Sequence, residues 1–299
     1  MLLTQALKSE GIVFKENEPM SCHTSFKTGG SADVFILPTG VDMLSKALKL
    51  CAEFKLNPLV VGNGSNLLIP DSGLRRPVIL MTEGFSSIEV KDTVIHCSAG
   101  VPLVRLCRFA LDNALTGLEF AYGIPGSAGG AVCMNAGAYG GEMKDVLLSC
   151  SHLDKNGVSG SLYGSDLDLS YRKSAYSTNG CAVTSLTVGL RSSSRSEIKE
   201  KMDELMARRK DKQPLEYPSA GSVFKRPEGY FAGALIEQSG LKGKTIGGAQ
   251  VSVKHAGFIV NIGGATTKDV TDLIEFCRET VYKNTGVMLE PEIKTAQDI

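Results

Sequence analysis

The sequence predicts an α+β protein that ends in a separate α+β unit. Helical stripes and strand-like apolar runs follow one another without the regular β-α order of a doubly wound sheet. The clearest break in composition is the run SSSRS at 192–196, and the chain changes character beyond residue 214, where a Pro-punctuated loop begins. Of 299 residues, 42% are hydrophobic and 21% charged. A chain of this length and composition is expected to hold more than one domain and a sizeable core.

Periodicity and punctuation predict the elements in order. Apolar residues at helical spacing predict a helix over 41–54, and a Pro near its start supports another over 102–114. The other helices are expected at 1–10, 196–212, 233–239 and 267–284, of which 196–212 is charged and amphipathic. Strands are expected at 32–38, 58–62, 67–69, 77–81, 86–90, 93–98, 146–153, 181–190, 257–261 and 287–293.

Charge and apolar patterning exclude several classes of function. Lys and Arg together number 32, as do Asp and Glu, so no nucleic-acid partner is expected. No segment approaches the roughly 18 continuous apolar residues of a membrane span, and the N-terminus lacks the features of a signal peptide. We therefore expect no membrane insertion. The basic triplet at 208–210 fits either a solvated helix face or an attraction for an anionic substrate.

Eight cysteines are spread along the chain, and no two stand at CxxC spacing. The four histidines do not cluster with them, so neither a metal site nor a disulfide framework is expected. Cysteines in apolar surroundings act as small core residues, and this usage is typical of a reducing compartment. We therefore expect a cytoplasmic protein.

Two glycine-rich segments indicate a binding site for an anion. The longer, at 122–140, has six Gly and four Ala among its nineteen residues, and the shorter, at 61–66, reads VGNGSN. Such a run is expected to bury little apolar surface, but it lets the backbone approach a ligand so that amides converge on a phosphate. Ordinary turns are the alternative, and for the shorter segment the two interpretations are equally supported.

Neither of two partial nucleotide motifs is complete. The sequence at 62–67 begins like the dinucleotide fingerprint GxGxxG, but Leu67 replaces its last glycine and no helix is expected to follow. The sequence at 239–245, SGLKGKT, resembles the end of a P-loop, but Gln238 stands where the first glycine is required. A Rossmann loop and a P-loop are therefore excluded.

Three polar residues in loop-like contexts are candidate site residues. Arg172, flanked by aromatic residues in LSYRKSAY, is either an anchored anion binder or a surface charge. Ser222, in PSAGSVFKRP, presents a hydroxyl on a tight turn or simply serves the turn. Glu292 ends the last expected strand, where carboxylates are usually solvated. Periodicity alone does not decide between these alternatives.

Taken together, the segments resemble the MurB family of UDP-N-acetylenolpyruvoylglucosamine reductases. The matching segments follow the family's order and cover nearly the whole chain. They are TSFKTGGSAD (24–33), VVGNGSNLLIPD (60–71), GLEFAYGIPGSAGGAVCMNAGAYG (117–140), YRKSAY (171–176), PSAGSVFKRP (218–227), GGAQVSVKHAGFIVN (247–261) and LEPEIK (289–294). The short stretch between 176 and 214 resembles the family type that lacks an inserted tyrosine-bearing loop.

The resemblance implies non-covalent FAD in a fold of the vanillyl-alcohol-oxidase/PCMH type. It implies two α+β FAD-binding subdomains, at 1–79 and 80–195, and a C-terminal α+β substrate domain at 196–299. The implied FAD contacts are Val61, Gly62, Asn63, Gly64, Ser65, Asn66, Leu67, Tyr122, Gly123, Pro125, Gly126, Ser127, Gly129, Gly130, Asn135 and Gly137. The pyrophosphate of FAD is then the anion that the glycine-rich backbone meets.

The resemblance also implies a reaction and its residues. NADPH would reduce FAD, and UDP-N-acetylglucosamine enolpyruvate would then be reduced to UDP-N-acetylmuramate for peptidoglycan by a monomeric enzyme. By motif position, the catalytic residues are Arg172, Ser222 and Glu292. The implied substrate contacts are Tyr171, Lys212, Lys225 and His255.

Two departures and two alternatives accompany the resemblance. Arg226 stands where FKNP is common, and Lys244-Thr245 replaces residues that are often bulkier, so these substrate-domain contacts are expected to differ. A flavin oxidase would need an oxygen-tolerant site and often a covalent flavin link, for which His23 and Cys133 lie near FAD-binding segments but in no linkage motif. A non-catalytic nucleotide-sugar binder would not need the three catalytic residues.

Overall fold

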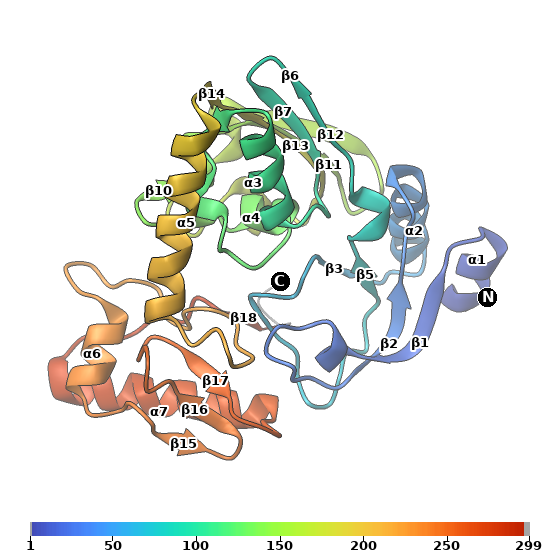
Figure 1. Ribbon diagram of the computed structural model, residues 1–299. Coiled ribbons are helices and arrows are strands. Elements are labelled where there is room, and N and C mark those ends of the chain that lie inside the picture. Colours follow the sequence, from blue (N-terminus) through green and yellow to red (C-terminus); the bar gives the residue numbers. More distant parts are fainter. Residues whose placement is uncertain (1, 296–299) are drawn as a thin grey trace. The chain divides into compact units, whose positions relative to one another are not determined.

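The structure, a computed structural model, describes residues 2–295 (Figure 1). The first residue of the predicted helix 1–10 and the last four residues of the predicted domain 196–299 lie outside this range. The helices are α1 (Leu3–Ser9), α2 (Val41–Glu53), α3 (Leu103–Asp112), α4 (Ala128–Cys133), α5 (Arg195–Lys212), α6 (Ala232–Gln238) and α7 (Thr267–Thr285).

The strands are mostly short. They are β1 (Phe14–Pro19), β2 (Ser31–Ile36), β3 (Leu59–Val61), β4 (Leu67–Leu68), β5 (Val78–Leu80), β6 (Ile88–Lys91), β7 (Val94–Ser98), β8 (Leu115–Thr116), β9 (Gly137–Ala138), β10 (Gly141–Glu142), β11 (Leu147–Leu153), β12 (Ser159–Tyr163), β13 (Ala182–Gly189), β14 (Arg191–Ser192), β15 (Thr245–Ile246), β16 (Ala249–Val251), β17 (Ile259–Asn261) and β18 (Lys294–Thr295). Within residues 2–295, no helix combines the length and the apolar character needed to cross a membrane.

The chain folds into two compact units, each built from separated stretches. Unit 1 contains Met1–Asn17, Val34–Asn63 and Arg76–Arg208, and unit 2 contains Glu18–Asp33, Gly64–Arg75 and Arg209–Ile299. Two early stretches thus join the C-terminal part of the chain in unit 2, and the domain boundaries at residues 79 and 195 stay predictions. The assignment of FAD-binding and substrate-binding segments stays a prediction.

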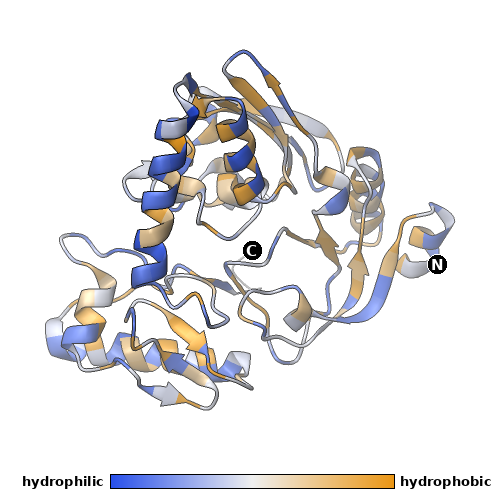
Figure 2. Ribbon diagram, in the orientation of Figure 1, coloured by the Kyte–Doolittle hydropathy of each residue, from blue (hydrophilic) through white to orange (hydrophobic). Residues whose placement is uncertain are grey.

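Unit 1 is organised around a five-stranded antiparallel sheet in the order β12-β11-β13-β7-β6. Buried and half-buried residues alternate along most of β13, which places Leu186 and Val188 in the core. A second sheet has the order β1-β2-β5-β3, in which β5 pairs in parallel with β2 and β3. Helix α5 is mostly hydrophilic (Figure 2) and buries Ile198, Met202 and Leu205 along one stripe.

The long glycine-rich segment contains helix α4, which the sequence analysis did not expect. Its Ala128, Ala131 and Val132 are buried in the core of unit 1. The expectation that this run buries little apolar surface is therefore wrong. Small side chains let the helix pack closely against its neighbours, so the segment serves both the core and the loop that precedes it.

Unit 2 contains the three-stranded antiparallel sheet β15-β16-β17, and α7 packs against β15 and β16. Strand β17 is mostly hydrophobic (Figure 2), and all three of its residues are buried. The core of unit 2 also includes Phe26 and Leu68 from the two early stretches, packed with C-terminal residues such as Val223 and Ile259. These contacts explain why the early stretches belong to this unit.

The predicted strand at 287–293 is wrong, because that segment forms no ladder. Its main chain forms single hydrogen bonds with Val223 and Lys225, and Pro291 forms an isolated bridge with Phe224. Only β18 is a paired strand here, parallel to β4. The apolar Leu289 and Ile293 are nevertheless buried, so the apolar pattern indicated burial and not strand pairing.

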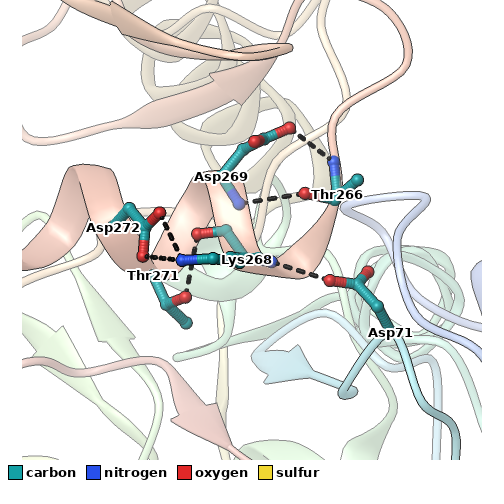
Figure 3. Close-up of polar contacts among 6 residues, drawn as sticks. All are labelled: Asp71, Thr266, Lys268, Asp269, Thr271 and Asp272. Atoms are coloured by element: carbon teal, nitrogen blue, oxygen red, sulfur yellow. Dashed lines mark hydrogen bonds and ion pairs between the residues drawn. The ribbon is translucent and has the colours of Figure 1, made fainter.

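The N-terminus of α7 is capped twice. Thr266 and Asp269 form a capping box, and Asp71 accepts a hydrogen bond from the Lys268 amide at 2.9 Å (Figure 3). Asp71 also accepts one from the Thr267 amide at 2.8 Å. The first turn of a helix leaves amides without intrahelical partners, and a carboxylate there also meets the positive end of the helix dipole. Asp71 thus ties an early stretch of chain to the C-terminal helix.

We expect Asp71→Ala to destabilise the protein by about 0.5–2 kcal/mol, the usual cost of losing a helix cap. Urea unfolding followed by circular dichroism should show the lower midpoint. The matched control is Asp272→Ala. It removes a carboxylate on α7 itself, which binds only the exposed Lys268 side chain (Figure 3). Equal midpoints for the two variants would contradict the capping role of Asp71.

Candidate active site

The two glycine-rich segments meet in unit 1. Strand β3 ends at Val61, whose carbonyl accepts a hydrogen bond from the Met81 amide at 2.8 Å. A Cβ added to Gly62 would lie 2.2 Å from the Oγ of Ser127, closer than any real side chain tolerates. A side chain at residue 62 would therefore force the Ser127 hydroxyl out of its place. Ser127 is buried and caps α4 by accepting from the Gly130 amide at 3.3 Å.

Some backbone amides of these segments donate hydrogen bonds within the protein, and others do not. Ala128 and Gly129 donate to the carbonyls of Val101 and Ala99, both at 2.8 Å, so their amides are not available to a ligand. In contrast, the amides of Gly62 and Ser127 donate no hydrogen bond to another described residue. Amides of this kind, brought together by a close backbone approach, fit the pyrophosphate of a dinucleotide. The predicted FAD contact through Gly129 is thus limited to atoms other than its amide.

The continuation of the short segment, residues 64–67, belongs to unit 2. Gly64 has a φ of +58°, and a Cβ there would lie 2.0 Å from the carbonyl oxygen of His23. Its own carbonyl accepts from the Ser25 amide at 3.2 Å. Asn66 donates from Nδ2 to the carbonyl of Glu292 at 3.3 Å and accepts from the Lys294 amide at 3.0 Å. A predicted FAD segment is therefore bonded to the chain that carries Glu292.

Asn135 is fully buried, and its side chain is committed to the protein. Its Nδ2 donates to Glu142 Oε2 at 2.8 Å and to the Ser170 carbonyl at 2.9 Å, and its Oδ1 accepts from the Lys144 amide at 2.9 Å. Any FAD contact by Asn135 is left to its backbone. The side chain instead joins the end of the glycine-rich segment to the turn that carries Arg172.

Arg172 occupies a strained position in that turn. Ser170 and Lys173 bond to each other through both main-chain pairs, at 3.0 and 3.1 Å, and Arg172 between them has a φ of +55°. A side chain in this left-handed region costs about 1–2 kcal/mol. The guanidinium donates to the Gly137 carbonyl at 3.3 Å, and its Cζ lies 5.0 Å from the centre of the exposed Tyr171 ring. Strain of this kind is typical of functional sites.

Ser222 and Glu292 lie on adjoining segments of unit 2. The Glu292 amide donates to the Val223 carbonyl at 2.7 Å, and Ser222 forms an isolated bridge with Phe258. The Ser222 hydroxyl has two carbonyl acceptors within the unit, Phe224 at 3.3 Å and Gly257 at 3.5 Å, both longer than an ordinary hydroxyl bond. Because these bonds are weak, the hydroxyl proton is available to another acceptor.

The predicted substrate residues differ in their surroundings. Lys225 forms an ion pair with Glu290, Lys212 is exposed in the last turn of α5, and Tyr171 lies against Arg172. His255 accepts the Gly257 amide on Nδ1 at 3.1 Å, and burial lowers the pKa of this histidine below 6.5. Burial thus favours the neutral form of this imidazole.

Burial raises the pKa of Cys133 to about 11. A thiol with this pKa stays protonated and is a poor nucleophile, so it is unsuited to a covalent flavin link. All eight cysteines are free. Within residues 2–295, no group of three or more His, Cys, Asp or Glu side chains is arranged to hold a metal ion.

Two family models match the chain. The model described as an FAD binding domain matches residues 32–159, and the model described as the C-terminal domain of UDP-N-acetylenolpyruvoylglucosamine reductase matches residues 213–296. The glycine-rich segments lie in the first match, and Ser222, His255 and Glu292 lie in the second.

Individual relatives agree with these matches. A UDP-N-acetylenolpyruvoylglucosamine reductase of Listeria innocua is 50% identical over 283 residues, which are 95% of each chain. The enzyme of that name from Clostridioides difficile is 47% identical over 98% of this chain and 95% of its own. The crystal structure of MurB from Thermus caldophilus has a TM-score of 0.81 and 34% identity, covering 95% of this chain and 98% of that one. Physcomitrella patens BBE-like 1 shares the fold alone, with a TM-score of 0.50, 17% identity and coverage of 64% and 45%.

Fold and family matches together define the protein as an FAD-dependent oxidoreductase with the predicted α+β fold of the vanillyl-alcohol-oxidase/PCMH type. More particularly, the chain belongs to the MurB family of UDP-N-acetylenolpyruvoylglucosamine reductases, which confirms the resemblance seen in the sequence. The roles of individual residues stay predictions. Val223 and Gly257, which hold the segments of Ser222 and Glu292, were not predicted as functional residues. Their only signal in the sequence is that they lie within the family segments 218–227 and 247–261.

We expect Gly62→Ala to lower the FAD content of the purified protein, because the new Cβ would displace the Ser127 hydroxyl that caps α4 beside the glycine-rich backbone. The ratio of flavin absorbance to protein absorbance measures this content directly. Gly40→Ala is the control, since Gly40 is extended and a Cβ there would meet nothing within 4 Å. Full flavin content in Gly62→Ala would show that the approach of the two segments does not matter for FAD.

Proposed function

We propose that the protein reduces UDP-N-acetylglucosamine enolpyruvate to UDP-N-acetylmuramate for peptidoglycan synthesis, with NADPH as reductant and non-covalent FAD as cofactor. The observation that supports it most is the main-chain bond that holds Ser222 and Glu292 on adjoining segments, within a chain of the MurB family. A cytoplasmic location and a monomeric state accompany this proposal as predictions.

The reaction defines what the residues must do. When bound, FAD supplies the redox chemistry by carrying a hydride from NADPH to the terminal vinyl carbon of the substrate. Negative charge then develops on the neighbouring carbon and spreads into the substrate carboxylate. The protein must stabilise this charge where it appears and deliver one proton to the carbon.

Arg172 and Glu292 are proposed to stabilise the developing charge. A guanidinium is always charged and holds a carboxylate through two parallel hydrogen bonds. The tight turn at 170–173 fixes the backbone of Arg172 before the substrate arrives. Glu292, in its protonated form, would donate a hydrogen bond to the same carboxylate.

Ser222 is proposed to deliver the proton to the carbanionic carbon. A serine hydroxyl is a weak acid, but the acceptor is a strong base and the hydroxyl is positioned in advance. The long distances from its Oγ to its protein acceptors support this role. A hydroxyl held by one short bond would have to break it before donating.

Tyr171, Lys212, Lys225 and His255 are proposed to bind the sugar nucleotide. Cationic side chains suit its diphosphate. Lys225 would exchange part of its ion pair with Glu290 for this contact. His255 would use Nε2, because its Nδ1 already accepts from the protein.

An anaerobic titration tests the overall proposal. NADPH should bleach the flavin spectrum, and only the enolpyruvyl sugar nucleotide should restore it in the absence of oxygen. Restoration by oxygen with turnover of another substrate would instead indicate an oxidase. A flavin that NADPH does not bleach would indicate a protein that only binds nucleotide sugars.

Ser222→Ala should slow reoxidation by the substrate by orders of magnitude and leave bleaching by NADPH unchanged. The reason is that only the second half-reaction requires a proton at carbon. Stopped-flow absorbance separates the two steps. Ser222→Cys should retain part of the rate, since a thiol also donates a proton. A normal second half-reaction in the Ala variant would leave Ser222 as a turn residue.

Arg172→Lys and Glu292→Gln should each lower kcat and kcat/KM together, by about 10²–10³. Lysine keeps the charge but loses the two-pronged bond, and glutamine keeps a donor but cannot release a proton. Steady-state kinetics over a range of substrate concentrations measure both constants. A rise in KM with unchanged kcat would assign the residue to substrate binding only.

A further inference from the structure

His255 lies beside the main chain that holds Ser222. Its Nδ1 accepts the Gly257 amide at 3.1 Å, and its ring packs edge-on against Phe258 with 5.0 Å between the ring centres. The Ser252 hydroxyl accepts the amides of Lys254 and His255, at 3.1 and 3.2 Å, which fixes the turn that carries the imidazole. The imidazole is thus bonded to the turn that leads into Phe258.

Gly257 connects this imidazole to Ser222. Its carbonyl accepts the Val223 amide at 2.9 Å and lies 3.5 Å from the Ser222 Oγ. A Cβ on Gly257 would lie 3.0 Å from His255 Cε1 and 3.4 Å from the Ser222 Oγ. The peptide chain at Gly257 therefore lies between the two side chains and contacts both.

We propose that His255 is a positioning residue for the proton donor: by accepting the Gly257 amide on Nδ1, it fixes the segment whose carbonyl binds the Val223 amide and thereby places the neighbouring Ser222. This inference rests on the proposed role of Ser222. It assigns the Nδ1 side of the ring to the protein and leaves the Nε2 side for the substrate contact proposed above.

The ring must be neutral for this role, because a protonated imidazole carries a hydrogen on Nδ1 and cannot accept there. Burial lowers the pKa of His255 below its ordinary 6.5 and keeps the acceptor available at neutral pH. Two charged groups act on the ring from α6 and the loop after it. Lys242 lowers the pKa further and Glu237 raises it, and the two form an ion pair of 2.7 Å.

Two substitutions distinguish the contact made by Nδ1 from the contact made by Nε2. In His255→Asn the side-chain oxygen can occupy the place of Nδ1 and accept the Gly257 amide, whereas His255→Gln places its polar group near the place of Nε2. We expect His255→Gln to slow the second half-reaction about 10–100-fold, the usual cost of a small misplacement of a reacting group. His255→Asn loses the Nε2 contact and should raise the KM for the sugar nucleotide, but at saturating substrate it should keep clearly more of the rate of the second half-reaction than His255→Gln. Bleaching by NADPH should be unchanged in both.

The pH dependence of the wild type provides a test that needs no variant. The rate of the second half-reaction should be full above the pKa of His255 and should fall as the pH drops through it, below 6.5. The amide resonance of Gly257 should shift with the same midpoint in a nitrogen-edited NMR titration of the flavin-loaded protein. In His255→Asn this acidic limb should disappear.

The outcomes separate this inference from the function on which it rests. A slow Ser222→Ala variant with equal rates in the two His255 variants would keep the proposed function and overturn the positioning role. So would a Gly257 resonance that does not follow the rate. If Ser222→Ala is normal, the proton donor itself is misassigned and His255 has nothing to position. Flavin content and melting temperature show that each variant is folded.

Discussion

The main chain of Val223 is the constraint on which the candidate catalytic groups of unit 2 depend. Its amide donates to Gly257 at 2.9 Å, and its carbonyl accepts from Glu292 at 2.7 Å, so one fully buried residue joins three segments that are distant in the sequence. Side chains on the neighbouring residues are then placed by backbone geometry and not by their own packing. This kind of advance positioning is what a site needs if its groups are to act without rearrangement.

In unit 1 the main chain also positions a predicted catalytic residue, Arg172, but it does so through a strained turn. There the buried side-chain amide of Asn135 donates to the carbonyl of Ser170, and the paired main chains of Ser170 and Lys173 close a two-residue turn in which Arg172 has a φ of +55°. The buried network offsets the cost of that strain, because Asn135 uses both of its donors and its acceptor within the protein. The two units thus hold their predicted catalytic residues with main-chain geometry, one through a buried hub and one through a strained turn.

The sequence predicted elements where a local pattern determines them, and it failed where distant contacts decide. Helices α2 and α7 follow apolar periodicity, and both were expected within about two residues of their observed bounds. The segment at 287–293 also has an apolar pattern, but its backbone partners are Val223, Phe224 and Asn66, which no local rule reveals. Phe26 likewise joins the C-terminal core only because the fold brings it there. For the site, the resemblance supplied Arg172, Ser222 and Glu292, whereas the residues that hold them, Val223 and Gly257, became visible only in the structure.

The two departures from the family motif, Arg226 and Lys244-Thr245, lie in unit 2 and leave the main-chain bonds of Val223 intact. Arg226 lies with its Cζ 4.0 Å from the centre of the Phe231 ring and donates to the Tyr230 carbonyl at 3.3 Å, and the Lys244 ammonium lies 4.7 Å from the centre of the Phe276 ring. Both cations thereby gain an aromatic partner, an interaction worth roughly 0.5–1 kcal/mol at exposed sites. Neither residue takes part in the main-chain bonds at Val223. Because those bonds depend on no side chain at 226 or 244, the chain can vary its substrate-domain surface at these positions without displacing Ser222 or Glu292.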